Sequence, residues 1–386
     1  NGDSTSSPIL QAEADVLAVS GQGNSSRLTF RLGWEDAKYW NPEQPFLYSL
    51  ELVLLDGERV IDRVEQQFGF REIWTECSQF ILNGTPIHLR GDSWHFQGAI
   101  QQTQEYVRTW YGMCKEAGVN CVRLHAAPHP TYYLDIADEM GMLIVDETAI
   151  YGSSKSMPAD HPDYIANCKA HVRRLVERDR NHPSIILWSL QNEMRWVDGR
   201  DIFKQHMPSM MNLIRELDPT RPIIAEGDNR LLPKELTEVE SRHYNIDGTI
   251  DAWDRKAPLV FGEHGGWWYV CPQNSSMYVG LAAYRNTDEC IKGLAEKERL
   301  FVEYARRQGV SGISTFNFAH YFMRAMPERD IVLPPSAPET PGPKPKVIPK
   351  YALTLNNGLL PKEYPLYMKN PSFPIMEASF KPATMI

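Results

Sequence analysis

The sequence predicts a (β/α)₈ barrel, and three observations support that fold. Apolar strand patterns and amphipathic helix patterns alternate from about residue 70 to about residue 330. Eight strands can be counted, and eight βα units occupy roughly 250 residues, the usual size of this barrel. No glycine-rich phosphate loop follows an early strand, which disfavours the competing doubly wound sheet. The expected strands lie near residues 87, 121, 143, 185, 223, 242, 259 and 313.

The region before the barrel predicts a partial antiparallel β domain of the immunoglobulin-like kind. Residues 1–26 are rich in Ser, Gly, Asn and Asp and are expected to be an irregular entry segment. Residues 27–70 alternate as strands do, and Asp56-Gly57 is a typical hairpin turn. The expected strands are 28–32, 47–54 and 59–68. Three strands are too few for a complete sandwich.

The barrel is expected over residues 71–330. A strand at 79–84 ends in an Asn-Gly turn and precedes the first barrel strand at 87–91. The strand at 184–189 is continuously apolar, as in a parallel sheet that is covered on both faces. The expected helices are 104–117, 132–140, 166–180, 203–217 and 296–308, three of which are followed by a glycine that would end them.

The last part, residues 331–386, is expected to be a Pro-rich linker and tail. Seven prolines between residues 334 and 349 favour an extended chain without a helix or a central strand. Residues 350–386 contain short apolar stretches, and no helix or strand is predicted there.

Composition narrows the range of partners. The chain has 386 residues, a net charge of −9 and no run of about 18 apolar residues, so we expect neither a nucleic-acid partner nor a membrane span. Six cysteines without a CxxC pair argue against structural zinc, and we expect no metal and no cofactor. No signal peptide is visible, although a processed chain would look the same. We favour a secreted or periplasmic location over a cytoplasmic one.

Functional side chains of such a barrel lie at the carboxyl ends of its strands. These ends carry Asp92, His95, Arg123, His125, Asp146, Glu147, Asn192, Glu193, Glu226, Tyr244, Glu263, His264 and Asn317. The set lacks a serine nucleophile elbow and an HExxH helix. Two carboxylates that face each other across a polar mouth are what cleavage of a glycosidic bond requires. Glu193 and Glu263, after the fourth and seventh strands, are the candidate pair.

Several segments resemble glycoside hydrolase family 2, which holds β-galactosidases, β-glucuronidases and β-mannosidases. Residues 178–193, RDRNHPSIILWSLQNE, resemble the acid/base signature of that family. Further similar segments are 40–50 and 68–71 at the immunoglobulin-like domain and its junction, 80–91 at the first barrel strand, and 120–125 and 135–141 in the second βα unit. The resemblance covers about residues 34–330.

The resemblance implies a retaining β-glycosidase with no cofactor. Glu193 would be the general acid/base and Glu263 the nucleophile. Tyr244 and a nearby His or Arg would keep Glu263 ionised, and Asn192 would bind the sugar 2-hydroxyl. The further substrate-binding residues would be Asp92, His95, His125 and Trp268. Because the segment 123–129 is one residue shorter than the family pattern, either His125 or His129 fits the role in the pocket.

The substrate is expected to be an oligo- or polysaccharide with terminal β-linked sugars, galactoside-type favoured, which the enzyme would remove from the chain end. No clear counterpart of the Asn-x-Lys pair of β-glucuronidases is present, so a modified sugar is also open. One alternative is a carbohydrate-binding barrel without catalysis. Another is a metal-dependent hydrolase using His95, His125 and His264, although no ligand spacing supports it.

Family members usually begin with a sugar-binding β-sandwich and a whole immunoglobulin-like domain. We therefore expect this chain to be the catalytic part of a longer protein or a shortened member. An incomplete sandwich predicts exposed β edges, which a missing N-terminal domain or a second copy of the chain would cover.

Overall fold

The computed structural model of the chain describes residues 10–14, 28–94, 103–152, 159–227, 238–244, 248–265, 272–316, 331–332, 347–348 and 371–381. The chain divides into two compact units, residues 1–38 and residues 39–386. In the first unit, residues 28–38 form no strand, so the strand expected at 28–32 is wrong. Alternation gives a segment two faces, but a strand also needs a partner for its backbone hydrogen bonds. The elements below all belong to the second unit.

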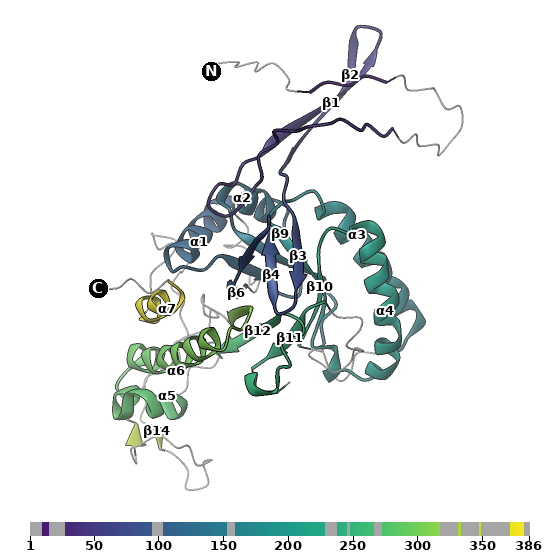
Figure 1. Cartoon of the computed structure of the whole chain (residues 1–386). Coiled ribbons are helices and arrows are strands. Elements are labelled where there is room, and N and C mark those ends of the chain that lie inside the picture. The colour runs from purple at the N-terminus through teal and green to yellow at the C-terminus, as the bar shows by residue number, and fades with distance from the viewer. Residues whose placement is uncertain are drawn as a thin grey trace. The chain divides into compact units, whose positions relative to one another are not determined.

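Eight parallel strands form the main sheet (Figure 1). They are β6 (Leu89–Trp94), β7 (Cys121–Leu124), β8 (Leu143–Glu147), β9 (Ile185–Asn192), β10 (Ile223–Glu226), β11 (Glu240–His243), β12 (Leu259–Gly265) and β13 (Gly312–Phe316). Their order is β10-β9-β8-β7-β6-β13-β12-β11. At the seam between β10 and β11, the Ser241 hydroxyl accepts from the Gly227 N–H at 3.1 Å and donates to Glu226. The predicted (β/α)₈ barrel is confirmed, and its first strand begins two residues later than expected.

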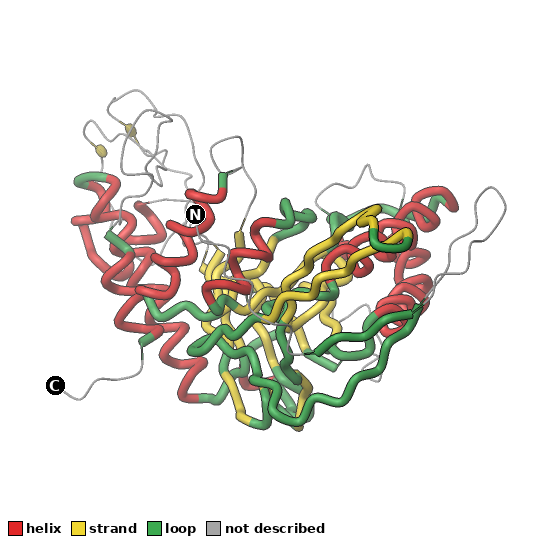
Figure 2. Tube along the Cα trace, turned by 90° about the horizontal axis from the view of Figure 1, so that it is seen from above, coloured by secondary structure: helices red, strands yellow, loops and turns green. Residues whose placement is uncertain are grey.

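Helices surround this sheet, as Figures 1 and 2 show from two directions. They are α1 (Gln104–Glu116), α2 (Tyr132–Met140), α3 (Pro162–Asp179), α4 (Arg200–Leu217), α5 (Pro272–Val279) and α6 (Thr287–Arg307), with short 3₁₀ turns η2 (Met194–Trp196), η5 (Ile250–Ala252) and η6 (Gly280–Tyr284). All five predicted helices are present. Helices α3 and α6 begin earlier than expected because His161 and Asn286 cap their amino termini. Polar first turns hid these starts from the apolar pattern.

A small antiparallel sheet closes one end of the barrel. It consists of β3 (Ile73–Glu76), β4 (Gln79–Leu82) and β5 (Thr85–Ile87). Phe80 and Leu82 pack in one apolar cluster with inward residues of the barrel such as Val145 and Val260. The segment 80–91 therefore contains most of the β4–β5 hairpin and then the start of β6. Only residues 89–91 belong to the first barrel strand that was expected there. Asn83-Gly84 reverses the chain, and both residues have positive φ.

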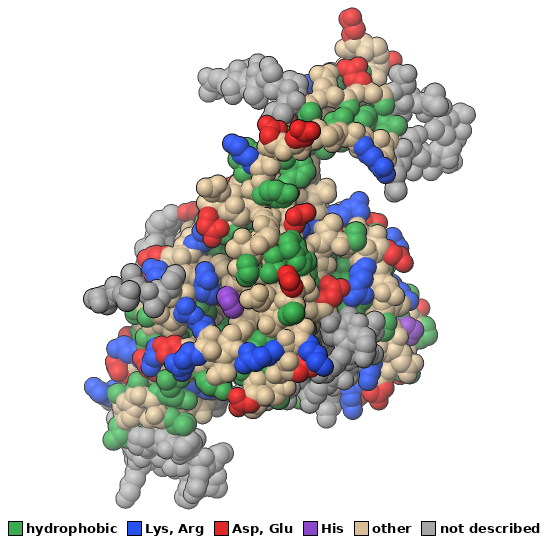
Figure 3. All heavy atoms as spheres, in the orientation of Figure 1, with side chains coloured by type: hydrophobic (Ala, Val, Ile, Leu, Met, Phe, Trp, Pro, Cys, Tyr) green, Lys and Arg blue, Asp and Glu red, His purple; other side chains and the backbone are tan. Residues whose placement is uncertain are grey.

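Before the barrel, β1 (Tyr48–Asp56) and β2 (Arg59–Phe68) form an antiparallel hairpin that turns at Gly57. Large apolar side chains lie exposed along both strands, as Figure 3 shows in green. They include Leu50, Leu52, Leu54, Leu55, Val60, Ile61 and Val64. These side chains lie on the faces of the hairpin. The expectation that a missing domain or a second copy of the chain covers exposed β edges stays a prediction. At the junction, fully buried Trp40 donates to Asp138 O at 2.8 Å.

The tail contains one helix that the sequence analysis missed. Helix α7 (Phe373–Phe380) buries Phe373, Met376 and Phe380 in the outer core, and Arg306 of α6 donates to the Ser379 carbonyl. The expectation of no helix or strand in residues 350–386 is thus wrong. A helix of only eight residues gives a weak periodic pattern, and the core against which α7 packs is formed only in the folded chain. Two short strands, β14 (Ile331–Val332) and β15 (Val347–Ile348), pair antiparallel. In the described part of the chain, no helix is long and apolar enough to cross a membrane.

Candidate active site

Six charged or titratable side chains from six successive strand ends meet inside the barrel. They are Arg123 of β7, Glu147 of β8, Glu193 directly after β9, Glu226 of β10, His243 of β11 and Glu263 of β12. Alternation along each strand turns these positions inward, above the apolar cluster that fills the other end. Five of the six are buried, whereas the Glu193 side chain keeps 19% of its surface exposed. Glu193 is therefore the carboxyl that outside molecules reach first.

Arg123 is the fixed cation of this cluster. Its Nε and Nη2 donate to the two oxygens of Glu147 at 3.0 and 2.9 Å, and its Nη1 donates to Glu263 Oε1 at 3.0 Å. Burial lowers the pKa of Arg123, but the carboxylates of Glu147, Glu226 and Glu263 outweigh burial and raise it. Ser189 holds Glu147 from the other side, with a 2.6 Å hydrogen bond. The Arg123 guanidinium thus links the candidate nucleophile Glu263 to Glu147, which is itself held by Ser189.

Glu263 is surrounded by groups that favour its ionised form. Besides Arg123, His125 Nε2 lies 3.1 Å from Oε1, and the Tyr244 hydroxyl donates to Oε2 at 3.4 Å. Burial would raise the pKa of Glu263, yet His243, His125 and Arg123 hold it well below its ordinary value. The expected donors, Tyr244 with a His and an Arg, are the ones that the structure brings to this carboxylate.

Glu193 is held by its backbone as well as by its side chain. Its φ is 50° and its ψ 33°, a left-handed conformation that a non-glycine residue adopts only under constraint. The Glu193 N–H donates to Glu226 O at 3.1 Å, and Oε1 lies 2.8 Å from His243 Nδ1 and 3.3 Å from Arg195 Nη2. Tyr244 has a φ of 51° as well. Backbone strain thus coincides with two of the predicted site residues.

Glu193, His243 and Glu263 each bring one potential ligand atom within 4.8 Å of the others. The three neighbouring carboxylates raise the pKa of His243 to about 10, against the opposite effect of burial. In its protonated form the ring can donate a hydrogen bond from each nitrogen. We therefore interpret the cluster as a set of groups that share protons and charge.

Sterics explain why a glycine, Gly262, precedes Glu263. A Cβ added to Gly262 would lie 1.8 Å from Glu226 Oε2, so only glycine leaves room for that carboxylate.

Most of the other predicted site residues can be placed. Asn192 Oδ1 accepts from Arg123 Nη2 at 2.6 Å, which leaves the Asn192 amide N–H groups as donors. His125 faces Glu263, whereas His129 is buried with its Nδ1 2.9 Å from Ala127 O. A pocket role for either histidine stays a prediction. Asp92 is fully buried and accepts from Thr315 at 3.1 Å. The substrate role expected for Asp92 stays a prediction.

Three of the candidates, His95, Trp268 and Asn317, lie outside the described residues. Two others face the helices. Asp146 lies beside Asp179 of α3, and His264 Nδ1 lies 2.8 Å from Glu298 of α6 while its ring stacks on Phe301. The three-histidine metal site is not formed by its described members, because His125 and His264 contact different carboxylates on opposite sides of the strands.

From the sequence alone, Glu226 has no assigned role and His243 does not stand out. Arg123 is recognisable there only as a residue at a strand end. A signal was present, since Arg123, Glu226 and His243 occupy the alternate positions that point inward near the carboxyl ends of their strands. Knowing which alternate positions point inward requires the register between strands, which a single sequence does not display.

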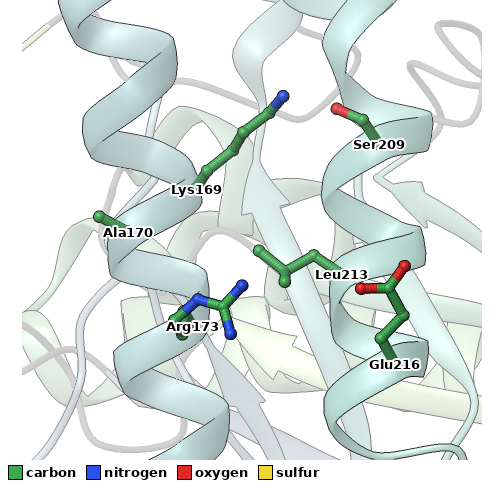
Figure 4. Close-up of a pocket in the computed structure, with 6 residues that line it drawn as sticks. All are labelled: Lys169, Ala170, Arg173, Ser209, Leu213 and Glu216. Atoms are coloured by element: carbon green, nitrogen blue, oxygen red, sulfur yellow. The ribbon is translucent and has the colours of Figure 1, made fainter.

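A shallow depression between α3 and α4 is separate from this cluster (Figure 4). It is lined by Lys169, Ala170, Arg173, Ser209, Leu213 and Glu216. Arg173 lies 3.7 Å from Glu177 one turn along α3, as on a solvated helix face. None of these residues belongs to the strand-end cluster.

Comparison with known proteins identifies the family. The model "Glycosyl hydrolases family 2, TIM barrel domain" matches residues 73–265, and "Glycosyl hydrolases family 2" matches residues 4–71. The chain is a member of glycosyl hydrolases family 2, a family of glycoside hydrolases, and the resemblance drawn from its motifs is confirmed.

Individual relatives agree with this assignment. A protein of Formosa agariphila named "Putative beta-glucuronidase" is 34% identical over 57% of this chain and 21% of its own length. A β-galactosidase of Streptococcus thermophilus is 28% identical over 67% of this chain and 26% of its own length. The chain thus spans about a quarter or less of these curated relatives.

Among solved structures, a family 2 β-galacturonidase of Eisenbergiella tayi bound to galacturonate has a TM-score of 0.65 and 22% identity. The similarity covers 91% of this chain and 61% of that one. At this identity the match shows a shared fold.

Proposed function

We propose that the chain is a retaining, exo-acting β-glycosidase that removes terminal β-linked sugars, galactoside-type favoured, from oligo- or polysaccharides. Glu263 attacks the anomeric carbon and forms a glycosyl ester while Glu193 protonates the departing oxygen. Glu193 then takes a proton from water, which attacks the same carbon and releases Glu263. Asn192 contributes a hydrogen bond to the sugar 2-hydroxyl.

One observation carries this proposal. One carboxylate oxygen of Glu193 and one of Glu263 lie within 4.8 Å of each other. Retaining glycosidases keep their two carboxyls about 5–5.5 Å apart, whereas inverting enzymes need roughly 6.5–9.5 Å to admit a water between them. The electrostatics agree with these roles, since Glu263 is buried among donors and Glu193 is the exposed member of the pair.

The galactoside preference is supported by the name of one relative, the β-galactosidase. The Asn-x-Lys of the sequence, Asn167-Cys168-Lys169, lies in helix α3 and not at a strand end of the barrel. Because other relatives are named for uronides, the test includes both classes. Purified protein would be screened on aryl β-galactosides, β-glucuronides and β-galacturonides. We expect the greatest kcat/KM on the galactoside.

The stereochemical test follows the first-formed sugar by NMR. A β-configured product is expected, and an α-configured product would contradict the two-Glu covalent mechanism. Binding of oligosaccharides without any turnover would instead support a carbohydrate-binding barrel. With an oligosaccharide substrate, release of monosaccharides alone is expected, and internal fragments would contradict exo action.

A further inference from the structure

His243 lies between three carboxylates that come from three different strand ends. Its Nδ1 is 2.8 Å from Glu193 Oε1 and 3.6 Å from Glu263 Oε2, and its Nε2 is 3.3 Å from Glu226 Oε2. The ring is fully buried. Because Nε2 faces Glu226 and Nδ1 faces Glu193 and Glu263, the imidazolium form of the ring can donate towards carboxylates on both sides.

The surrounding backbone is shaped to hold this pair of side chains, Glu226 and His243. A Cβ on Gly227 would lie 2.8 Å from His243 Nδ1, and a Cβ on Gly262 would lie 1.8 Å from Glu226 Oε2. Ser241 Oγ donates to Glu226 Oε2 at 2.5 Å, which fixes that carboxylate behind the ring. Two glycines and a hydroxyl therefore define the position of the Glu226–His243 pair.

We propose that Glu226 and His243 act as a positioning pair for the acid/base residue. Glu226 holds the ring so that its Nδ1–H points at Glu193 and fixes that carboxyl for proton transfer. This inference rests on the proposed function. Neither side chain needs to touch the sugar, because His243 acts through Glu193 and Glu226 acts through His243.

The position of His243 matches the movement of charge in the reaction. In the first step Glu193 gives its proton to the leaving oxygen and becomes negative, while Glu263 loses its charge as its oxygen bonds to the anomeric carbon. In the second step water gives a proton to Glu193 as its oxygen bonds to that carbon, and the ester electron pair returns to Glu263. One negative charge thus alternates between two carboxylates that both lie within 3.6 Å of His243 Nδ1. The imidazolium stabilises both arrangements.

Other charges around the ring set the pH range in which it works. Glu193, Glu226 and Glu263 favour its protonated form, whereas burial and Arg123 oppose it, and Arg195 faces Glu193 from the next turn. The result is a His243 pKa of about 10, so the ring stays cationic through neutral pH. Replacing Glu226 by Gln removes one of the three anions that raise the pKa of His243. The ring then loses its proton at a lower pH, so the alkaline limb of kcat/KM should move to lower pH.

The test compares two leaving groups on the sugar that the wild-type protein hydrolyses best. A phenyl glycoside needs protonation of its leaving oxygen, and a 2,4-dinitrophenyl glycoside does not. General acid catalysis contributes about 100- to 10,000-fold. We expect His243→Gln and Glu226→Gln to lose about 10- to 100-fold more kcat on the phenyl substrate than on the dinitrophenyl substrate, as a share of that effect. His243→Asn keeps a donor near the Nδ1 position and should recover part of the loss.

A matched control is His264→Asn, which removes a second buried histidine that pairs with a glutamate, but on the helix side of the strands. Its ratio between the two substrates should equal that of the wild type. Equal losses on both substrates in the His243 and Glu226 variants, or no loss, would overturn the positioning role. If Glu263→Gln retained turnover, the proposed function itself would fail, and the inference with it. If either His243→Gln or Glu226→Gln does not fold, the other variant still allows the comparison between the two substrates.

Discussion

Two sets of buried charges share this barrel, one inside the strands and one between the strands and the helices, and they are connected differently. On the helix side, charges pair one to one, as in Arg221 with Asp218 and His264 with Glu298, the latter at 2.8 Å. Inside the barrel, Arg123 and His243 each face three carboxylates. A one-to-one pair fixes its charges, whereas a group with several partners lets charge move between them. The inner set is therefore suited to chemistry and the outer set to holding helices in place.

The largest expected difference concerns two buried glutamates that both face histidines. Glu263→Gln should reduce turnover to the background rate, because an amide cannot form the glycosyl ester. Glu298→Gln should retain kcat within about threefold, since its partner His264 faces away from the cluster. Steady-state rates on one aryl glycoside, with circular dichroism to verify folding, would check both. A loss of turnover in Glu298→Gln would break the comparison between the inner and outer sets.

The second comparison uses two buried arginines. Arg123→Met removes the guanidinium that three buried carboxylates face, and Arg221→Met leaves buried Asp218 without its guanidinium partner. Removing one partner of a buried ion pair destabilises a fold by about 3–5 kcal/mol, and we expect a loss of this size for each variant.

The two arginine variants should differ in their pH dependence. Arg123 is one of the groups that hold the pKa of Glu263 low, so its loss raises that pKa. If Glu263 is the nucleophile, as proposed, it must be ionised to attack. The acidic limb of kcat/KM then moves to higher pH in Arg123→Met and stays in place in Arg221→Met. Urea denaturation and pH–rate profiles provide the two measurements. Identical profiles for the two variants would show that Arg123 is only structural.

A smaller effect is expected at Asp146, on the outer side of β8. Burial, followed by the nearby Asp179 carboxylate, raises the pKa of Asp146 well above its ordinary value. The folded state then holds a proton that the unfolded state releases above about pH 4. Stability from this group is full below that pH and falls as the pH rises towards the folded pKa.

Asparagine cannot ionise, so Asp146→Asn should be more stable than the wild type at pH 7. Each 1 kcal/mol of added stability should raise Tm by about 2–4 °C. The difference should shrink towards pH 4, and kcat should not change. Thermal melts at pH 4, 5.5 and 7 test this, and a variant that is less stable at every pH would refute it.

The smallest expected effect is that of Trp188→Phe. Trp188 faces the helices and its Nε1 donates to Asp218 Oδ2 at 2.8 Å. Loss of this single hydrogen bond should lower the free energy of unfolding by about 1–2 kcal/mol, with kcat unchanged. A urea titration gives the first value and an aryl glycoside assay the second. A marked fall in kcat would mean that the outer layer controls the geometry of the inner one.

Much of the fold could be read from local patterns. The periods of strand and helix located the eight barrel strands and five helices, and strand ends combined with family motifs selected Glu193 and Glu263. Errors arose where the decisive partner is distant. Residues 28–32 alternate without forming a strand, and α7 is apolar because it packs against α6.

The sequence by itself determined the order of the elements and pointed to Glu193 and Glu263 as the candidate pair, because periodicity and strand ends are local properties. Only the tertiary structure decided that Arg123 meets Glu263, 140 positions along the chain. It also decided that His243 lies between Glu193, Glu226 and Glu263, because these contacts require the register of neighbouring strands and the approach of β10 to β11. The strength and direction of each pKa shift depend on those distances and on burial, and neither exists before the barrel folds.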